Sequence, residues 1–223
     1  MTLRAGVVVF PGSNCEHDVV SALGSLGAEA RLVWHKEGDL SGLDLVVLPG
    51  GFAHGDYLRP GAIARFSPVV GELAAFVGRG GAVLGICNGF QVLTEAGLLP
   101  GALQKNIGLR FVCRDVELRV ESTSNILTSA LEEGERVRIP VNHFEGCYTA
   151  DADDLRRLEG EGRVVLRYLD NPNGSANDIA GISDATGRIV GLMPHPERAM
   201  SKLVGGGDGR RLLSSLLGAL AAA

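Results

Sequence analysis

The sequence predicts an α/β protein with a mostly parallel, doubly wound sheet, flanking helices and a small antiparallel sheet. Two observations predict this class. Before residue 100, short apolar runs alternate with segments whose apolar residues recur at helical spacing, as in strands joined by crossover helices. After residue 100, the predicted strands become longer and more exposed, as in antiparallel pairs. A chain of 223 residues is most simply one domain, residues 1–223.

Four apolar runs are predicted to form the parallel strands, at residues 5–10, 30–34, 45–48 and 82–86. Turn residues close two of them: Pro11-Gly12 follows the first run and Pro49-Gly50-Gly51 follows the third. Helices are expected at residues 15–26, 67–79 and 89–96. Gly27 and Gly97 end the first and third helices, and Pro68 is tolerated in the first turn of the second.

The second half of the chain contains strands of a different kind. Residues 111–120 and 136–141 are predicted to be long strands that pair antiparallel. The turn residues 184–187 predict a β-hairpin between residues 179–183 and 189–193. The remaining expected elements are a short helix at 151–158, a strand at 164–168 and a terminal amphipathic helix at 209–222.

Composition excludes several classes of function. The formal net charge is -5, so nothing favours nucleic acid or an anionic membrane as a partner. The N-terminal apolar run is too short for a signal peptide, and no run reaches the roughly 18 apolar residues that span a bilayer. The four cysteines lack the spacing of a zinc ribbon or a disulfide framework. We therefore expect a soluble, cytoplasmic protein.

Cys87 lies at the junction between the strand 82–86 and the helix that follows, with Gly85 and Gly89 two positions away on either side. This is the cysteine form of the nucleophile elbow, a strained turn in which bulky neighbours would collide. The helix N-terminus favours the thiolate, and the Asn88 amide would point at a developing oxyanion. An isolated cysteine at a strand end is more often structural. The flanking glycines nevertheless favour a catalytic nucleophile.

A cysteine nucleophile needs a base and a group that orients the base. His195 follows a predicted strand end and precedes Glu197 by two residues, so both side chains face the same way in extended backbone. Two prolines bracket His195 and stiffen that geometry. His143 and Glu145 form a second possible pair. We rank it lower because no helix or strand end aims it at Cys87.

Other residues receive weaker assignments. Gly50-Gly51 lets a backbone amide approach a ligand, and with the Asn88 amide it would form an oxyanion hole, each donor contributing about 3 kcal/mol. The loop at residues 52–63 follows a strand at the sheet edge where ligands bind, so His54 is a candidate ligand contact. The remaining histidines, His17 and His35, are expected to be solvated. The remaining cysteines are expected to be structural: Cys15, Cys113 and Cys147.

Together these residues resemble the class I (triad) glutamine amidotransferases. The resemblance rests on residues 85–91, Pro49-Gly50-Gly51 and His195-Pro196-Glu197. Nearly the whole chain is further similar to one group within that family, the glutaminase subunits of de novo purine synthesis, through stretches such as Pro11-Gly12-Ser13-Asn14-Cys15, Gly55-Asp56-Tyr57-Leu58-Arg59 and Asp178-Ile179-Ala180-Gly181. One segment departs: the family often has Ala-His-Gly-Glu-Gly where this chain has Asn142-His143-Phe144-Glu145-Gly146.

The resemblance implies a flavodoxin-like fold and L-glutamine as the substrate. Cys87 would attack the side-chain amide, form a glutamyl thioester and release ammonia, while His195, oriented by Glu197, moves protons. Gln91 and the Gly51-Phe52 region would hold the substrate. The ammonia would pass to a separate synthetase subunit, joined by a small bridging subunit. ATP and magnesium would belong to that synthetase, so no cofactor or metal is expected in this chain.

Two alternatives remain open at this point. The elbow and the His-Pro-Glu segment also fit a glutaminase subunit of another pathway, such as anthranilate or imidazole glycerol phosphate synthesis. A cysteine hydrolase or chaperone of the DJ-1/PfpI type also carries an elbow cysteine, but a His-Pro-Glu segment so near the C-terminus is not expected there.

Overall fold

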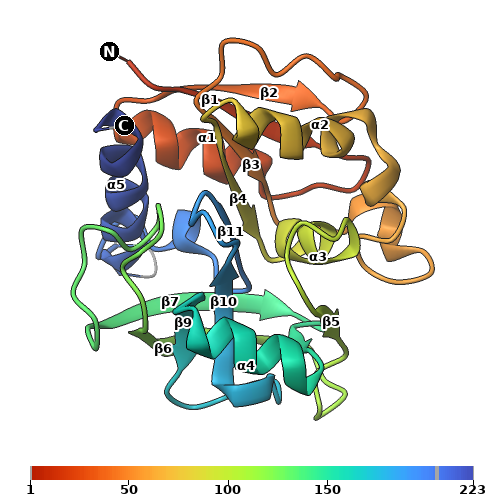
Figure 1. Cartoon of the computed structure of the whole chain (residues 1–223), viewed down its shortest axis with the longest axis vertical. Coiled ribbons are helices and arrows are strands. Elements are labelled where there is room, and N and C mark those ends of the chain that lie inside the picture. Colours follow the sequence, from red (N-terminus) through yellow and green to blue (C-terminus); the bar gives the residue numbers. More distant parts are fainter. Residues whose placement is uncertain (1, 204–205, 223) are drawn as a thin grey trace.

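The computed structural model describes residues 2–203 and 206–222 and contains a large mixed sheet with helices on both faces (Figure 1). The strand order is β2-β1-β3-β4-β11-β10-β9-β6-β7. The first five strands in that order are parallel: β2 (Glu29–Trp34), β1 (Arg4–Val9), β3 (Leu45–Leu48), β4 (Ala82–Ile86) and β11 (Ile189–Leu192). The predicted α/β class with a mostly parallel sheet is confirmed.

The other strands extend the same sheet in antiparallel fashion. They are β10 (Ile179–Ser183), β9 (Val164–Tyr168), β6 (Val112–Val120) and β7 (Arg136–His143). The predicted β10–β11 hairpin and the β6–β7 pair both form. Because β9 pairs with β10 on one side and β6 on the other, it joins these two units into one sheet.

A separate two-stranded antiparallel sheet pairs β5 (Ala102–Gln104) with β8 (Cys147–Thr149). The sequence predicts a small antiparallel sheet but not these two strands. Each has three residues, which is too short to show a period of two.

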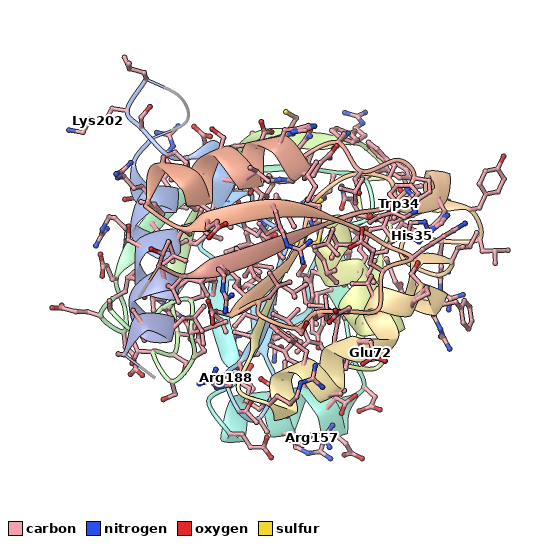
Figure 2. The ribbon with its side chains drawn as sticks, turned by 90° about the horizontal axis from the view of Figure 1, so that it is seen from above. Trp34, His35, Glu72, Arg157, Arg188 and Lys202 are labelled. Carbon is pink, nitrogen blue, oxygen red and sulfur yellow. The ribbon has the colours of Figure 1, made fainter. Side chains whose placement is uncertain are left out.

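Helices cover the parallel strands on opposite sides, with α1 and α2 separated by the sheet in the view of Figure 2. The helices are α1 (Glu16–Ser25), α2 (Pro68–Gly78), α3 (Asn88–Glu95), α4 (Ala152–Gly160) and α5 (Asp208–Ala221). Short 3-10 turns are η1 (Ala53–Asp56), η2 (Ala64–Phe66), η3 (Ala176–Asp178) and η4 (Pro196–Arg198). None of the described helices is both long and apolar enough to cross a bilayer.

The strand order reverses direction at β1, which lies between β2 and β3, and a ligand crevice is expected outside the carboxyl ends of such strands. Several loops meet there. Ser13, after β1, forms a bridge with Gly51, after β3. The Cys87 amide, after β4, donates to the Leu192 carbonyl of β11 at 2.8 Å. The topology therefore brings the elbow and the segment that carries His195 to one edge of the sheet.

Candidate active site

Cys87 has the strained backbone of a nucleophile elbow, with φ 51° and ψ -104°. The two glycines that flank it are required by close packing. A Cβ on Gly89 would lie 2.0 Å from the Leu48 carbonyl oxygen, and a Cβ on Gly85 would lie 2.8 Å from that of Gly89. The turn therefore has the geometry for which the Gly-x-Cys-x-Gly spacing is suited.

The Cys87 side chain is 6% exposed and sits at the N-terminus of α3. The first amides of a helix have no intrahelical acceptor, so Cys87 stands at the positive end of the α3 dipole. The thiol lies 3.8 Å from the Asn142 carbonyl oxygen at the end of β7. The sulfur is thus held between α3 and a segment from the antiparallel half of the sheet.

His195 and Glu197 form a buried pair, in which Nδ1 of the imidazole lies 2.6 Å from Oε1 of the carboxylate. The sequence predicts an extended backbone for this pair, and that prediction was wrong. Pro196 begins the turn η4 and does not continue an extended segment. The turn brings Glu197 back to the ring. His195 Nε2 is buried without a hydrogen-bond partner among the described residues, so it can exchange a proton with a bound substrate.

The pKa of His195 is raised well above its usual value of 6.5. Burial alone would lower this pKa, but the Glu197 carboxylate and the Cys87 sulfur favour the charged ring and outweigh it. Both neighbours therefore favour the protonated ring. An imidazole held beside a cysteine sulfur in this way can deliver a proton to a leaving group.

Cys15 is a residue of this site that the sequence argument placed among the structural cysteines. Its sulfur lines the pocket and accepts a hydrogen bond from Arg198 at 3.1 Å. A Cβ on Gly50 would lie 3.0 Å from this sulfur and 2.7 Å from the His195 ring. Gly50 therefore leaves room for the imidazole. The signal that was missed is topological: the loop after β1 ends beside the loop after β3.

Cys15, His195 and Glu197 each offer one donor atom, and these atoms lie within 4.8 Å of one another, as metal ligands would. Two contacts weigh against that role. The Arg198 guanidinium donates to the Cys15 sulfur and places a positive charge beside it. The Nδ1 atom of His195 is already bonded to Glu197. This arrangement fits a base with its orienting carboxylate better than a cation site.

Asn88 and Gln91, on the first turn of α3, belong to a polar network that ties three segments together. Asn88 accepts from the Ala53 amide at 3.0 Å and donates to Gln91 Oε1 at 2.8 Å. Gln91 then donates to the Glu145 carbonyl oxygen at 2.6 Å. These bonds hold the loop after β3 and the segment after β7 against the helix that carries the nucleophile.

The amides assigned to an oxyanion hole are not equally available. Phe52 donates its amide to the Gly12 carbonyl oxygen at 2.9 Å and therefore does not point freely into the pocket. Gly51 has φ +147°, and a Cβ there would lie 2.8 Å from Ser13 Cα. Gly51 is thus required for close approach to the loop after β1. The Asn88 amide, at the start of α3, keeps the position the elbow predicts.

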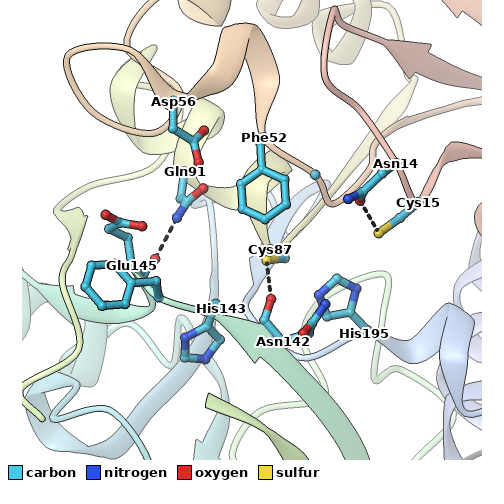
Figure 3. A pocket seen from close by; sticks show the side chains of 12 residues that line it. Asn14, Cys15, Phe52, Asp56, Cys87, Gln91, Asn142, His143, Glu145 and His195 are labelled. Atoms are coloured by element: carbon cyan, nitrogen blue, oxygen red, sulfur yellow. Dashed lines mark hydrogen bonds between the residues drawn. The ribbon is translucent and has the colours of Figure 1, made fainter. Parts of the chain in front are cut away.

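The residues around Cys87 enclose a pocket (Figure 3). The empty space of the pocket is about 360 Å³ when the part open to solvent is included. The cavity volume itself is only about 20 Å³. That is room for about one water. Side chains must move before a larger substrate enters. The lining residues are Asn14, Cys15, Gly51, Phe52, Asp56, Cys87, Gln91, Asn142, His143, Phe144, Glu145 and His195.

The segment 142–145 forms one wall of this pocket, although the sequence offered no strand end that aimed it at Cys87. β7 is far from β4 in the strand order, but the antiparallel strands cross below the ends of the parallel ones (Figure 1). The His195 amide donates to the Pro140 carbonyl oxygen of β7 at 2.8 Å. The end of β7 therefore meets the elbow, and the reason given for ranking this segment lower, that no strand end aims it at Cys87, was wrong.

His143 itself does not pair with Glu145. Its Nδ1 atom contacts Asn106 Oδ1 at 3.1 Å, and its Nε2 atom lies 3.5 Å from Asn173 Nδ2. Burial, and then the charge of His195, lowers the pKa of His143 to about 4. A neutral histidine fixed by two amides is suited to shape the wall of the pocket.

Two of the remaining histidines differ from expectation. His35 is buried, with Nδ1 2.8 Å from Ser67 Oγ, so its assignment as solvated was wrong. His54 packs against the His35 ring at 5.2 Å between centroids and does not line the pocket. Both rings also pack near Phe10, at 5.8 and 6.3 Å between centroids, and sequence spacing gives no sign of these contacts.

Two carboxylates also face the pocket, Asp56 from η1 and Glu145 from the segment after β7. Burial, and then the charge of Glu145, raises the pKa of Asp56 to about 6. The Asn88 side chain donates to Asp56 Oδ1 at 3.3 Å and opposes that shift. Burial also raises the pKa of Glu145, against the effect of Lys105. From the sequence, Glu145 was considered only as a partner of His143, and Asp56 was assigned no role.

Comparison with known proteins shows the family of this chain. The family model of the CobB/CobQ-like glutamine amidotransferase domain matches residues 2–205. The chain is 60% identical over 215 residues to phosphoribosylformylglycinamidine synthase subunit PurQ of Rubrobacter xylanophilus, covering 96% of this chain and 98% of that one. It is 54% identical over 222 residues to the same subunit of Synechococcus elongatus, covering 99% of this chain and 100% of that one.

Solved structures give the same result. The structure of PurLQS from Thermotoga maritima contains a chain with a TM-score of 0.91 and 45% identity, covering 99% of this chain and 100% of that one. A glutamine amidotransferase from the same organism has a TM-score of 0.64 at 16% identity, which is a likeness of fold alone.

Proposed function

This chain belongs to the CobB/CobQ-like glutamine amidotransferase domain family, and we propose that it works as the glutaminase subunit of a phosphoribosylformylglycinamidine synthase. The observation that carries the chemistry is the strained Cys87 at the start of α3, next to the buried pair of His195 and Glu197. A nucleophile, its base and an orienting carboxylate form the constellation of acyl transfer.

Cys87, as the thiolate, attacks the side-chain amide carbon of L-glutamine. The imidazolium of His195 gives its proton to the amide nitrogen, so ammonia leaves and a glutamyl thioester remains. His195, now neutral, takes a proton from water, which attacks the thioester and releases glutamate and the thiolate. Glu197 holds the ring in orientation and favours its charged form through both steps.

The oxyanion of each tetrahedral intermediate lies at the Asn88 amide, with a second donor from the Gly51-Phe52 region. The Phe52 amide must first leave the Gly12 carbonyl, so the hole is incomplete in the resting chain. Gln91 positions the substrate on the first turn of α3. The proposed steps in this chain use no cofactor.

The ammonia passes to a separate synthetase subunit, which uses ATP and magnesium to convert formylglycinamide ribonucleotide to the amidine, with a small third subunit bridging the two. The segment 52–66 supports such a docking role. Three of its large apolar side chains are mostly exposed: Tyr57 at 73%, Leu58 at 89% and Phe66 at 76%. A docked partner would cover them, and the single-domain, cytoplasmic chain then acts as one part of a complex.

The experiment that tests this function measures glutamate formation by the chain alone and in the presence of the synthetase subunit and its ligands. Glutamate production is expected to rise sharply on mixing, because docking at segment 52–66 releases the Phe52 amide and opens the pocket. Full-rate hydrolysis by the chain alone, unchanged by the partner, would contradict the coupling.

A variant separates the nucleophile from the rest of the complex. Cys87→Ala is expected to abolish glutamine-dependent synthesis while the assembled complex still uses added ammonia. An electrophilic glutamine analogue should label Cys87. Labelling of Cys15 or Cys113 in its place would remove the basis for this assignment.

A further inference from the structure

The two pocket carboxylates lie together on one side of the nucleophile. Figure 3 shows Asp56 and Glu145 beside Gln91, while His195 and Cys15 lie on the opposite side of Cys87. The carboxylates come from distant segments, η1 and the turn after β7. Their charges are close enough for Glu145 to raise the pKa of Asp56.

Neither carboxylate has a counter-ion in contact. Within residues 2–203 and 206–222, the ion pairs join other acids to arginines, as Glu95 is joined to Arg59 at 2.5 Å, or join Glu197 to His195. The charge of Glu145 raises the pKa of Asp56, and the charge of Lys105 lowers that of Glu145 against the effect of burial. Two like charges in a partly buried pocket repel each other, and a bound cation would relieve both the repulsion and the desolvation.

The backbone that carries Asp56 has an unfavourable conformation. Asp56 has φ +52° and follows His54 at φ +55° and Gly55 at φ +70°, a run of left-handed backbone that is unfavourable for residues other than glycine. Asn88 donates to the Asp56 carboxylate and, through Gln91, anchors the backbone of Glu145. The residues that surround the nucleophile therefore position both carboxylates.

We propose that Asp56 and Glu145 together bind the α-ammonium group of the substrate and so select L-glutamine over amides that lack this group. The inference rests on the proposed glutaminase activity. With the side-chain amide of glutamine at Cys87, the rest of the substrate must lie in the same pocket, which Asp56 and Glu145 line on the side of Gln91. The α-ammonium is the only cation of glutamine, and it meets the pair of acids at that end.

The test compares two substrates in the reconstituted complex. Glutaramate, the five-carbon monoamide, matches glutamine but has no α-ammonium. The wild-type ratio of kcat/KM for L-glutamine over glutaramate is measured first, then that of Asp56→Asn, Glu145→Gln and the double variant. Asparagine at 56 keeps an acceptor for Asn88, and glutamine at 145 leaves the backbone carbonyl that accepts from Gln91.

Each single variant is expected to lower kcat/KM for L-glutamine by about 10- to 100-fold, the range of a hydrogen bond to a charged group, while glutaramate hydrolysis stays the same. The ratio then falls. Glu95→Gln removes a carboxylate that pairs with Arg59 outside the pocket, and this matched control should leave the ratio unchanged. Ammonia-dependent synthesis and the melting temperature show that each variant folds and assembles.

Two outcomes overturn the inference. Equal losses for both substrates would mean that the carboxylates only support the structure, and an unchanged kcat/KM for L-glutamine would mean that they do not contact the ammonium. Failure of the proposed function is a separate result: the wild-type complex would then not hydrolyse L-glutamine at all.

Discussion

Two segments of this chain carry the same pattern, a histidine followed two residues later by a glutamate, and the structure treats them in opposite ways. In one, His195 lies 2.6 Å from Glu197, and its pKa is raised well above the usual value. In the other, His143 contacts Asn106, and its pKa falls to about 4. Both rings are buried. Burial therefore does not distinguish them; the neighbour does.

The difference arises from the backbone after each histidine. Pro196 starts a turn that returns Glu197 to the ring. After His143 the chain turns so that Gly146 lies against the imidazole, where a Cβ would come within 2.3 Å of Nδ1. Glu145 is then directed into the pocket and not to its histidine. The spacing of a histidine and a glutamate two residues apart suggests such a pair. The conformation of the backbone after the histidine determines whether the pair forms.

The largest effect is expected from a substitution that removes His195 from its pair with Glu197. His195→Ala should lower kcat for glutamine hydrolysis by about 10²- to 10⁴-fold, because ammonia then leaves without a proton donor. His143→Ala should cost far less in kcat. Steady-state glutamate release by both variants in the complex measures the contrast. A crippled His143→Ala enzyme beside a mildly affected His195→Ala enzyme would reverse the assignment.

The next effect concerns the carboxylate. Glu197→Gln should lower kcat by about 10²-fold or less, since the ring remains but loses its orientation and the charge that favours the imidazolium. Without that charge the pKa of His195 falls. The pH profile of kcat is therefore expected to change in shape as well as in height. NMR titration of the His195 ring in wild-type and variant chains would measure the shift directly.

A smaller effect is expected on the pH dependence of stability, through His143. Its folded-state pKa is lowered to about 4, so below pH 6.5 the unfolded chain binds a proton that the folded chain does not. The stability from a neutral His143 is present above pH 6.5 and is lost as pH falls toward 4, by about 1.4 kcal/mol per pH unit. Urea unfolding at pH 7 and pH 5 should show a shallower loss for His143→Gln than for the wild type. His17→Gln, at an exposed histidine, is the control.

The smallest effect is expected at Phe144, where the related family often has glycine. Phe144→Gly removes a ring from the wall of the closed pocket and frees the backbone of the segment. The two changes oppose each other in substrate binding. KM for L-glutamine should change less than about 10-fold, and kcat should stay near that of the wild type. A large fall in kcat would place Phe144 among the residues that position the reacting groups.

The local parts of this site were predictable from the sequence, and the parts that depend on distant contacts were not. The glycines around Cys87 act through neighbours within one turn, so their spacing predicts the elbow. The position of Cys15 beside His195 depends on loops that meet only after the strands have been ordered. The approach of segment 142–145 depends on where the antiparallel strands cross the parallel ones.

The same distinction holds for the fold. The strands of the parallel half are continuous apolar runs, and each is predicted within one or two residues of its observed bounds. β5 and β8 have three residues each and owe their pairing to the chain around them. His35 is polar and follows an exposed strand end, yet its partner Ser67 comes from the start of α2. Such pairs have no pattern in the sequence.

The position of β11 between β4 and β10 has a consequence for how the chain emerges during synthesis. β4 is buried along its whole length and pairs with β3 on one side, but its other neighbour is among the last strands to be made. Until then β4 presents an unpaired apolar edge, which is a template for aggregation. The nucleophile at its end likewise has no base, so the nascent chain cannot hydrolyse glutamine. Chains truncated before residue 189 are expected to aggregate, whereas completion of β11 closes the edge and delivers His195 in the same step.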